Sequence, residues 1–190
     1  SLVGRHIALA GVGKVGSALL GHLADAGARV TVADVTEAAV DRAVAESGAE
    51  AVDVEKVHAV DCDIYAPCAL GGALSAETIP ELRCAAVVGS ANNQLADGVT
   101  TARLLAGEGV LYAPDFVVNA GGLINIAEEL APGGYHPDQA LAAVRRIFDT
   151  VTSVLHAAEV GGVTTAEAAD RLAEERIATL SAVHNIRPPG

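Results

Sequence analysis

Short apolar runs alternate with amphipathic stretches along the first 114 residues of the chain. The runs are rich in small and β-branched apolar residues and stop at glycine, proline or an acid, as buried parallel strands do. The stretches between them repeat apolar residues every three or four positions, which is the spacing of one helix face. We therefore predict strands near 5–10, 28–34, 51–52, 62–67, 85–89 and 109–114, and helices at 14–26, 37–47 and 97–107.

The alternation of strands and helices decides the fold class. A strand that is followed by a helix and then by another strand builds a parallel sheet, because the helix returns the chain across the sheet. The predicted fold is α/β, with a doubly wound, mostly parallel sheet of the Rossmann type and C-terminal helices. We expect a dinucleotide-binding domain at 1–133, helices at 134–185 that pack on it or return to a further domain, and a tail at 186–190.

The pattern becomes helical after Pro114. We expect three helices, at 119–131, 137–159 and 164–183, and the first of them is opened by a glycine pair. A loop at 132–138 separates the first two helices. Thr164 or Thr165 shortly before Glu167 is the signature of a capping box at the start of the last helix.

The sequence GVGKVG follows the first predicted strand and opens the first predicted helix. Its glycines suit a tight turn, a close approach of the backbone to a pyrophosphate and close packing of the helix. The start of the helix offers unpaired amides and the positive end of its dipole to phosphates. An acid ends the next strand, and this full context separates a dinucleotide site from an ordinary glycine-rich turn. The expected cofactor-binding residues of this unit are Gly11, Val12, Gly13, Lys14, Val15, Gly16, Asp34 and Val35.

Asp34 favours NAD over NADP as the cofactor. Its carboxylate suits the hydroxyls of the adenosine ribose and would repel a 2′-phosphate. Val35, Thr36 and Glu37 offer no positive charge to offset it, and Arg42 is the nearest residue that could. The alternative for Asp34 is a solvated strand end.

Composition limits the other function classes. The chain has 190 residues, of which 51% are hydrophobic, enough for one sizeable core, and a net charge of −12. This charge makes nucleic acid and anionic membrane unfavourable partners. Three cysteines without metal-ligand spacing fit a reducing cytoplasm, and we expect no metal site. The chain contains no methionine and its first predicted strand begins close to Ser1, so we expect a piece of a longer protein.

Three small-residue loops follow later strands: APCALGG at 66–72, GSANNQL at 89–95 and APDFVVNAGG at 113–122. Ligands of doubly wound sheets bind at the carboxyl ends of the strands. Asn92 and Asn93 carry amide donors and acceptors that suit ribose or carboxamide groups.

These motifs resemble the Glu/Leu/Phe/Val amino-acid dehydrogenases, and within that family the leucine, valine and phenylalanine dehydrogenases. The matching segments are GVGKVG, CDIYAPCALGG, GSANNQLA, YAPDFVVNAGGLIN and AADRLAEERI. The resemblance implies reversible, NAD-linked oxidative deamination of a branched-chain or aromatic L-amino acid to a 2-oxo acid and ammonia. It adds the cofactor-binding residues Cys68, Ala69, Ser90, Ala91, Asn92 and Asn119. It also implies a substrate pocket of Asn119, Leu123 and Ile126, whose apolar members argue against glutamate.

The resemblance further implies an N-terminal domain that this chain lacks. In the family that domain carries two working lysines and a catalytic aspartate, and Lys14 and Lys56 match neither lysine motif. We therefore expect no catalytic residue here, NAD binding with little turnover, and a homo-oligomeric, cytoplasmic parent enzyme. A catalytically silent NAD-sensing or interaction module stays open as the alternative. A hydroxy-acid dehydrogenase would need a histidine–acid pair in motif context, which the sequence does not provide.

Overall fold

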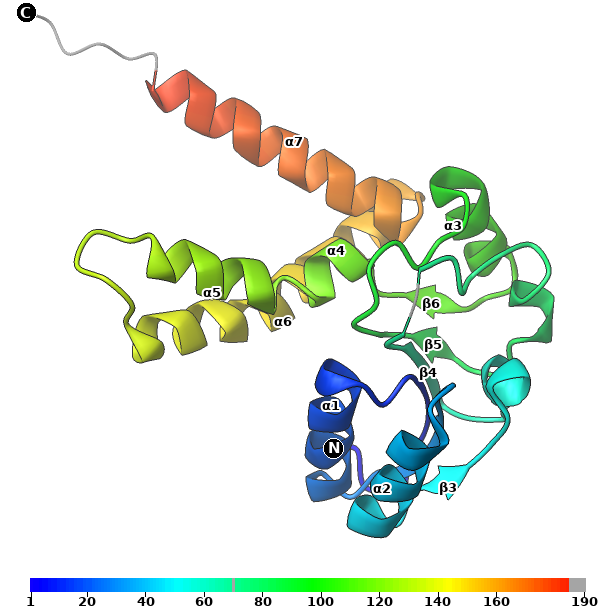
Figure 1. Cartoon of the computed structure of the whole chain (residues 1–190). Helices are drawn as coiled ribbons and strands as arrows, with labels where there is room; N and C mark the ends of the chain where they lie inside the picture. The colour runs from blue at the N-terminus through cyan, green and yellow to red at the C-terminus, as the bar shows by residue number, and fades with distance from the viewer. Residues whose placement is uncertain (70, 185–190) are drawn as a thin grey trace, which may run out of the picture.

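The computed structural model describes residues 1–69 and 71–184, and its elements follow the predicted order (Figure 1). The described strands form one sheet in the order β3-β2-β1-β4-β5-β6, and every pairing between them is parallel. The predicted α/β, doubly wound fold is therefore confirmed, with a wholly parallel sheet. The strands are β1 (His6–Ala10), β2 (Arg29–Ala33), β3 (Glu50–Ala51), β4 (Ile64–Pro67), β5 (Ala86–Val87) and β6 (Leu111–Tyr112).

Two apolar clusters fill the two faces of this sheet. Helices α1 (Lys14–Asp25) and α2 (Glu37–Ser47) supply the first cluster, which packs on Ile7 and Leu9 of β1. The second contains Ala8 of the same strand, because successive strand residues point to opposite faces. It is covered by α3 (Gly98–Gly107) and by the short 3-10 helices η1 (Val54–Ala59) and η2 (Ile79–Glu81).

The region after β6 differs from the prediction. One helix was expected at 119–131, but the structure has a single turn, α4 (Asp115–Val118), followed by α5 (Gly121–Glu129). Pro114 fixes its own backbone angle and precedes α4, while the buried Asp115 carboxylate accepts the amide of Phe116 in the first turn. These local contacts form an extra helical turn before the predicted helix, and α5 itself begins at the glycine pair.

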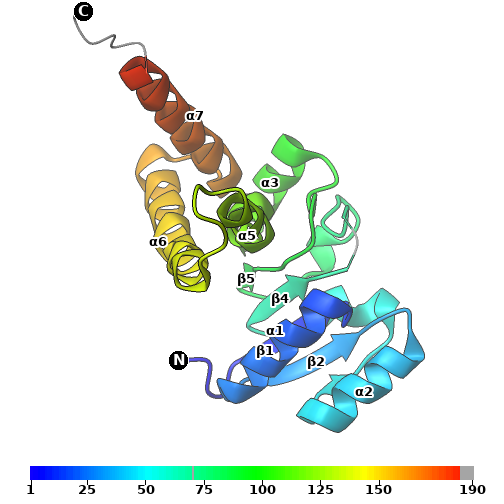
Figure 2. The same ribbon diagram turned by 60° about the vertical axis from the view of Figure 1, so that its left-hand side comes forward.

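The last two helices extend beyond the sheet. In Figures 1 and 2, α5, α6 (Pro137–Gly161) and α7 (Thr165–His184) form a group on one side of the sheet. A small cluster that includes Val154 and Ala169 holds α6 and α7 together. The Thr165 hydroxyl donates to the carbonyl oxygen of Tyr112 at 2.7 Å, which ties α7 to the edge strand β6. Within the described residues, no helix is both long and apolar enough to cross a membrane.

The predicted capping box begins α7, with Thr164 as the capping residue. The Thr164 hydroxyl accepts the amide of Glu167 at 3.2 Å, and the Glu167 carboxylate accepts the amide of Thr164 at 3.0 Å. The same carboxylate receives a hydrogen bond from Arg103 of α3 at 2.9 Å. The Thr164 amide and the Arg103 guanidinium lower the pKa of Glu167 to about 2. One charged side chain therefore both caps α7 and fastens it to α3.

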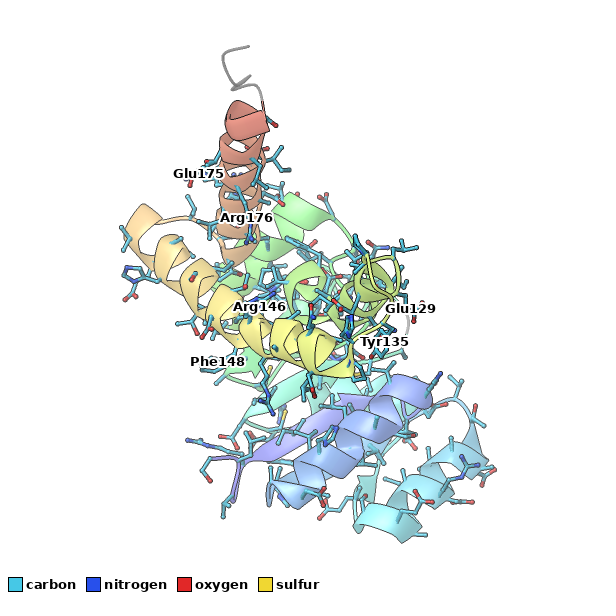
Figure 3. The ribbon with its side chains drawn as sticks, turned by 90° about the vertical axis from the view of Figure 1, so that its left-hand side faces the viewer. Glu129, Tyr135, Arg146, Phe148, Glu175 and Arg176 are labelled. Carbon is cyan, nitrogen blue, oxygen red and sulfur yellow. The ribbon has the colours of Figure 1, made fainter. Side chains whose placement is uncertain are left out.

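Acid should weaken this cap. A depressed carboxyl pKa contributes stability that is present above its ordinary value of 4.5 and is lost as the pH falls toward about 2. Wild type should exceed Glu167→Gln in free energy of unfolding near neutral pH, and the gap should close on acidification to about pH 2. Urea unfolding across this range measures the gap. Glu175→Gln, at an exposed site on the same helix (Figure 3), is the control, and an equally pH-dependent gap there would contradict the assignment.

Candidate cofactor site at the carboxyl ends of the strands

The glycine turn leaves β1 with a left-handed backbone and close contacts. Gly11 has a φ of +101°, and a Cβ there would lie 2.8 Å from the Cβ of Ala69. A Cβ on Gly16 would lie 1.9 Å from the carbonyl oxygen of Gly11. A Cβ on Gly13 would meet no described atom within 4 Å. Two glycines are thus required by packing, whereas the third leaves an open side where a ligand could approach the backbone.

The N-terminus of α1 provides amides for an anion. Gly13 is the N-cap, and no side chain of the described residues caps this end. The first amide to bond back is that of Ser17, which donates to the carbonyl oxygen of Gly13 at 2.9 Å. The preceding amides of the first turn, Lys14 to Gly16, have no carbonyl one turn earlier in the helix. The turn therefore fits the pyrophosphate of a dinucleotide, since oriented amides and the helix dipole favour negative charge there.

Asp34 is fixed beside the turn rather than freely solvated. Its Oδ2 accepts the amide of Val12 at 2.8 Å, and its Oδ1 accepts the amide of Thr36 at 2.9 Å. Burial acts to raise the pKa of Asp34, but the hydrogen bonds from Thr36 and Val12 outweigh it and leave the pKa below its ordinary value. The carboxylate therefore stays ionised at neutral pH and keeps lone pairs for ribose hydroxyls. Val35, also predicted to bind the cofactor, is exposed just after it.

The loop after β4 lies against the glycine turn. The Cys68 amide donates to the carbonyl oxygen of Ala10 at 2.7 Å, and the Ser90 amide donates to the Cys68 sulfur at 3.5 Å. The Cys68 side chain packs against the cluster beneath α1. Cys68 is thus a small filler between two loops, which agrees with a backbone role for it. Ala91, buried in the loop after β5, donates its amide to Pro67 at 3.0 Å.

Two predicted residues far apart in sequence meet at this edge. Asn119 ends α4, Asn92 follows β5, and the Asn119 Nδ2 donates to the Asn92 Oδ1 at 2.6 Å. This bond leaves the Asn92 amide nitrogen as a donor and the Asn119 oxygen as an acceptor. A primary carboxamide offers the matching acceptor and donor, so the pair suits the nicotinamide end of the cofactor.

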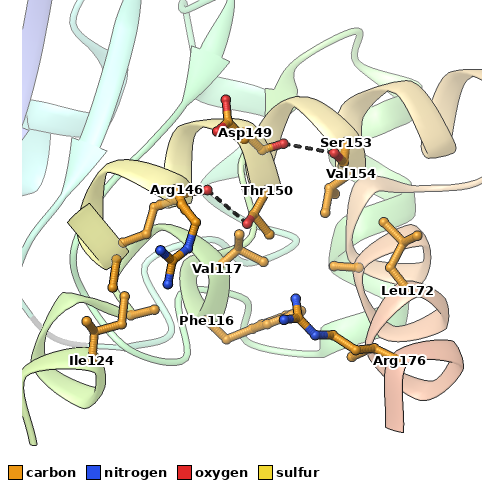
Figure 4. Close-up of a pocket in the computed structure, with 15 residues that line it drawn as sticks. Phe116, Val117, Ile124, Arg146, Asp149, Thr150, Ser153, Val154, Leu172 and Arg176 are labelled. Carbon is orange, nitrogen blue, oxygen red and sulfur yellow. Dashed lines mark hydrogen bonds between the residues drawn. The ribbon is translucent and has the colours of Figure 1, made fainter. Parts of the chain in front are cut away.

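The predicted substrate-pocket residues of α5 lie on its surface. Leu123 is 72% exposed and Ile126 is 54% exposed, and the described cavities do not include them. A cavity of about 740 Å³ is instead bounded by α4, α5, α6 and α7. Arg146 and Arg176 project into it together with Ile124 (Figure 4). A pocket formed by Leu123 and Ile126 stays a prediction, and it would need a second surface facing α5.

Sequence reasoning missed the buried polar residues beneath the asparagine pair. Gln94 and Asp115 lie within the motifs that were singled out, but neither was assigned a role. Both are buried polar residues in the structure. Their only signal in the sequence is a polar residue just after an apolar strand.

Alanine substitutions at Gly13 and Gly16 should separate the effect of packing from the effect of ligand approach. Gly13→Ala should change the free energy of unfolding by about 1 kcal/mol or less but weaken NAD binding at least roughly tenfold, because the new methyl group occupies the open side of the turn. Gly16→Ala should destabilise by about 3 kcal/mol, through overlap with Gly11. Gly21→Ala, in open space on α1, is the control. Thermal unfolding and calorimetric titration give both quantities; unaltered NAD affinity in Gly13→Ala would count against the phosphate role.

Comparison with known proteins places the chain in a family. A family model described as Glutamate/Leucine/Phenylalanine/Valine dehydrogenase matches residues 31–184. The leucine dehydrogenase of Bacillus cereus is 48% identical over 180 residues, which cover 95% of this chain and 48% of that protein. The phenylalanine dehydrogenase of Thermoactinomyces intermedius is 43% identical over 187 residues, which cover 97% of this chain and 50% of that protein. The chain thus spans about half the length of these relatives.

A solved structure agrees with the sequence comparison. The crystal structure of L-tryptophan dehydrogenase from Nostoc punctiforme superposes with a TM-score of 0.91 at 41% identity, covering 94% of this chain and 53% of that one. The family match spans most of the chain, and the structural match includes the parallel sheet and the helices that follow it. The chain belongs to the glutamate/leucine/phenylalanine/valine dehydrogenase family and corresponds to the NAD-binding domain of that family.

Proposed function

We propose that this chain is the cofactor-binding half of an enzyme that reversibly deaminates a branched-chain or aromatic L-amino acid. The observation that carries the proposal is the gathering of the glycine turn, Asp34 and the bonded Asn92–Asn119 pair at one edge of the sheet. The names of the relatives, leucine, phenylalanine and tryptophan dehydrogenase, support an apolar side chain in the substrate.

NAD is the proposed cofactor. The amides of the first turn of α1 would hold its pyrophosphate, and Asp34 would accept hydrogen bonds from the adenosine ribose. The pKa of Asp34 lies below its ordinary value, so at neutral pH a negative charge faces the 2′ position. A 2′-phosphate would be repelled, which favours NAD over NADP. When bound, NAD supplies the hydride acceptor, and Asn92 and Asn119 would orient its carboxamide.

The lysines of this chain are unsuited to the proton transfers of deamination. A lysine that assists water attack needs a pKa lowered toward neutrality. Lys56 instead donates to Asp53 at 2.6 Å, and this pair raises the pKa of Lys56. Lys14 lies at the start of α1, beside the proposed pyrophosphate position. The proton-transfer groups would therefore come from the other half of the parent protein, and this chain alone would bind NAD with little turnover.

Helices α5 and α6 carry large exposed apolar side chains that another domain could cover. Large exposed apolar side chains typically mark interaction surfaces when they occur together. Phe148 projects from α6 (Figure 3) and is 76% exposed, and Leu130 at the end of α5 is 81% exposed. Leu123 and Ile126 also lie on α5. We propose that these side chains face a catalytic domain of the parent protein. We also propose that residues 1–133 form the cofactor domain and that the helices from 134 onward return to that catalytic domain, in a cytoplasmic homo-oligomer.

Replacing Asp34 should change cofactor choice. Asp34→Ala should weaken NAD binding by roughly 10-fold to 100-fold, because hydrogen bonds to a charged group are lost, and should leave NADP binding equal or stronger. Calorimetric titration of both nucleotides gives the ratio. Asp41→Ala, at an exposed site on α2, is the control. An equal loss of affinity for both nucleotides would show that Asp34 only supports the turn through Val12.

Replacing Leu123 should change substrate choice in the full-length parent. Leu123→Ala removes about three carbon atoms from the predicted pocket, so relative kcat/KM should shift toward bulkier amino acids by roughly tenfold. Leu180→Ala, at an exposed site on α7, is the matched control. An unchanged specificity profile removes Leu123 from the pocket. A full-length parent without any deamination activity would favour the silent NAD-binding module.

A further inference from the structure

A fully buried glutamine braces the loop after β5. Gln94 has no exposed surface, although glutamine is usually a surface residue. Its side-chain amide donates to the carbonyl oxygen of Gly89 at 2.8 Å and to that of Ala91 at 3.0 Å. Both carbonyls precede Asn92 in the loop. The glutamine therefore fixes the backbone from which Asn92 projects.

A buried carboxylate connects the same glutamine to α4. Asp115 is 8% exposed, and its Oδ2 accepts the backbone amide of Gln94 at 3.2 Å. Its Oδ1 accepts the Phe116 amide at 2.9 Å and the Tyr112 hydroxyl at 3.3 Å. Burial raises the pKa of Tyr112, so its hydroxyl keeps the proton that it donates. The carboxylate thereby joins the loop after β5 to the first turn of α4.

The helix α4 carries this connection to the second asparagine. It is one turn long, and the Asn119 amide donates to the Asp115 carbonyl oxygen at 2.9 Å. Asp115 thus lies at the start of the turn and Asn119 at its end. Gln94 holds the loop that contains Asn92. Asp115 holds the turn that ends at Asn119. The two asparagine side chains are hydrogen-bonded to each other at 2.6 Å.

The chemistry of Gln94 argues against a role in stability alone. Its side-chain Oε1 has no hydrogen-bond partner among the described residues. A buried acceptor without a partner lowers stability, and an apolar side chain of similar volume would avoid that loss. What an apolar side chain could not supply is the pair of donors to the loop carbonyls.

We propose that Gln94 and Asp115 are positioning residues for the nicotinamide end of the cofactor. They are too buried to contact a ligand, and they act by holding Asn92 and Asn119 at a fixed spacing. The free donor of Asn92 and the free acceptor of Asn119 then meet a carboxamide together. The proposal rests on the proposed function, because it assumes that the asparagine pair binds nicotinamide.

Two ligands isolate this effect on the existing chain. NAD and ADP-ribose share the pyrophosphate and the adenosine, but only NAD carries nicotinamide. Gln94→Glu replaces the donating group by a carboxylate oxygen that faces two carbonyls. At about pH 8 this variant should bind NAD roughly tenfold more weakly, because a lost hydrogen bond changes affinity by about that factor. Its ADP-ribose affinity should stay within about twofold of wild type. At about pH 5 part of the loss should return, since a buried glutamic acid has a raised pKa and its protonated form donates one bond.

Matched variants separate positioning from damage to the fold. Gln139→Glu makes the same change at an exposed site on α6 and should leave both affinities unaltered. Asp115→Asn should reproduce the selective NAD loss, and it serves as the test variant if Gln94→Glu does not fold. In an Asn119→Ala background, Gln94→Glu should cause little further loss, because it acts through the asparagine pair.

The outcomes distinguish the inference from the proposed function. An unchanged ratio of NAD affinity to ADP-ribose affinity in both Gln94→Glu and Asp115→Asn overturns the inference, whether neither affinity falls or both fall equally. Equal affinity of the wild type for NAD and ADP-ribose also overturns the inference, because the asparagine pair then adds no binding free energy for nicotinamide. Wild type that binds neither ligand overturns the proposed function, and the inference with it.

Discussion

The close approach of backbones at the end of β1 is the constraint on which the site depends. Gly11 donates its amide to Ala33 at the end of β2, and Cys68 after β4 donates to Ala10 at the end of β1. A side chain at Gly11 or Gly16 would separate these segments. Because parallel strands end at the same edge, this contact also brings Asp34 to the turn. The glycine turn and the Asp34 carboxylate are therefore parts of one packing arrangement.

Buried polar side chains hold a second part of the site, at the carboxyl ends of β5 and β6. Near the glycine turn, close contacts between backbones set most of the geometry, since small residues let the segments touch, and the Asp34 carboxylate adds a hydrogen bond to Val12. Strands β5 and β6 are only two residues long, and backbone hydrogen bonds such as that of Ala91 to Pro67 hold part of the loop after β5. Gln94 and Asp115 add further connections as side-chain hydrogen bonds. Such bonds are directional, so they hold an amide pair at one spacing more firmly than apolar packing would.

The sequence predicted best the features that are local along the chain. The glycine turn, the capping box at Thr164 and the α/β alternation each depend on residues a few positions apart, and each occurs in the structure. The extra turn at 115–118 was not predicted, because it depends on the burial of Asp115 after Pro114, which the local sequence pattern does not report. The asparagine pair joins residues 27 positions apart, and no periodicity reports such a contact. Leu123 and Ile126 are exposed, so the fold alone does not place them in a pocket, and the pocket that the resemblance implies would need a second surface facing α5.

The distribution of charge supports the proposal that amino-acid chemistry would need a second half of the protein. The chain carries a net charge of −12, and the pair Asn92 and Asn119 is neutral. An amino acid brings a carboxylate that must be held by a cation near the nicotinamide, and Lys56 is occupied by Asp53. Lys14 lies beside the anion-binding helix end, where its charge favours phosphate. Among the described residues at this edge, the asparagine pair suits a carboxamide, and neither lysine is placed to bind a substrate carboxylate. Under the proposed function, this half of the protein would therefore orient the cofactor, and the other half of the parent protein would hold the substrate carboxylate.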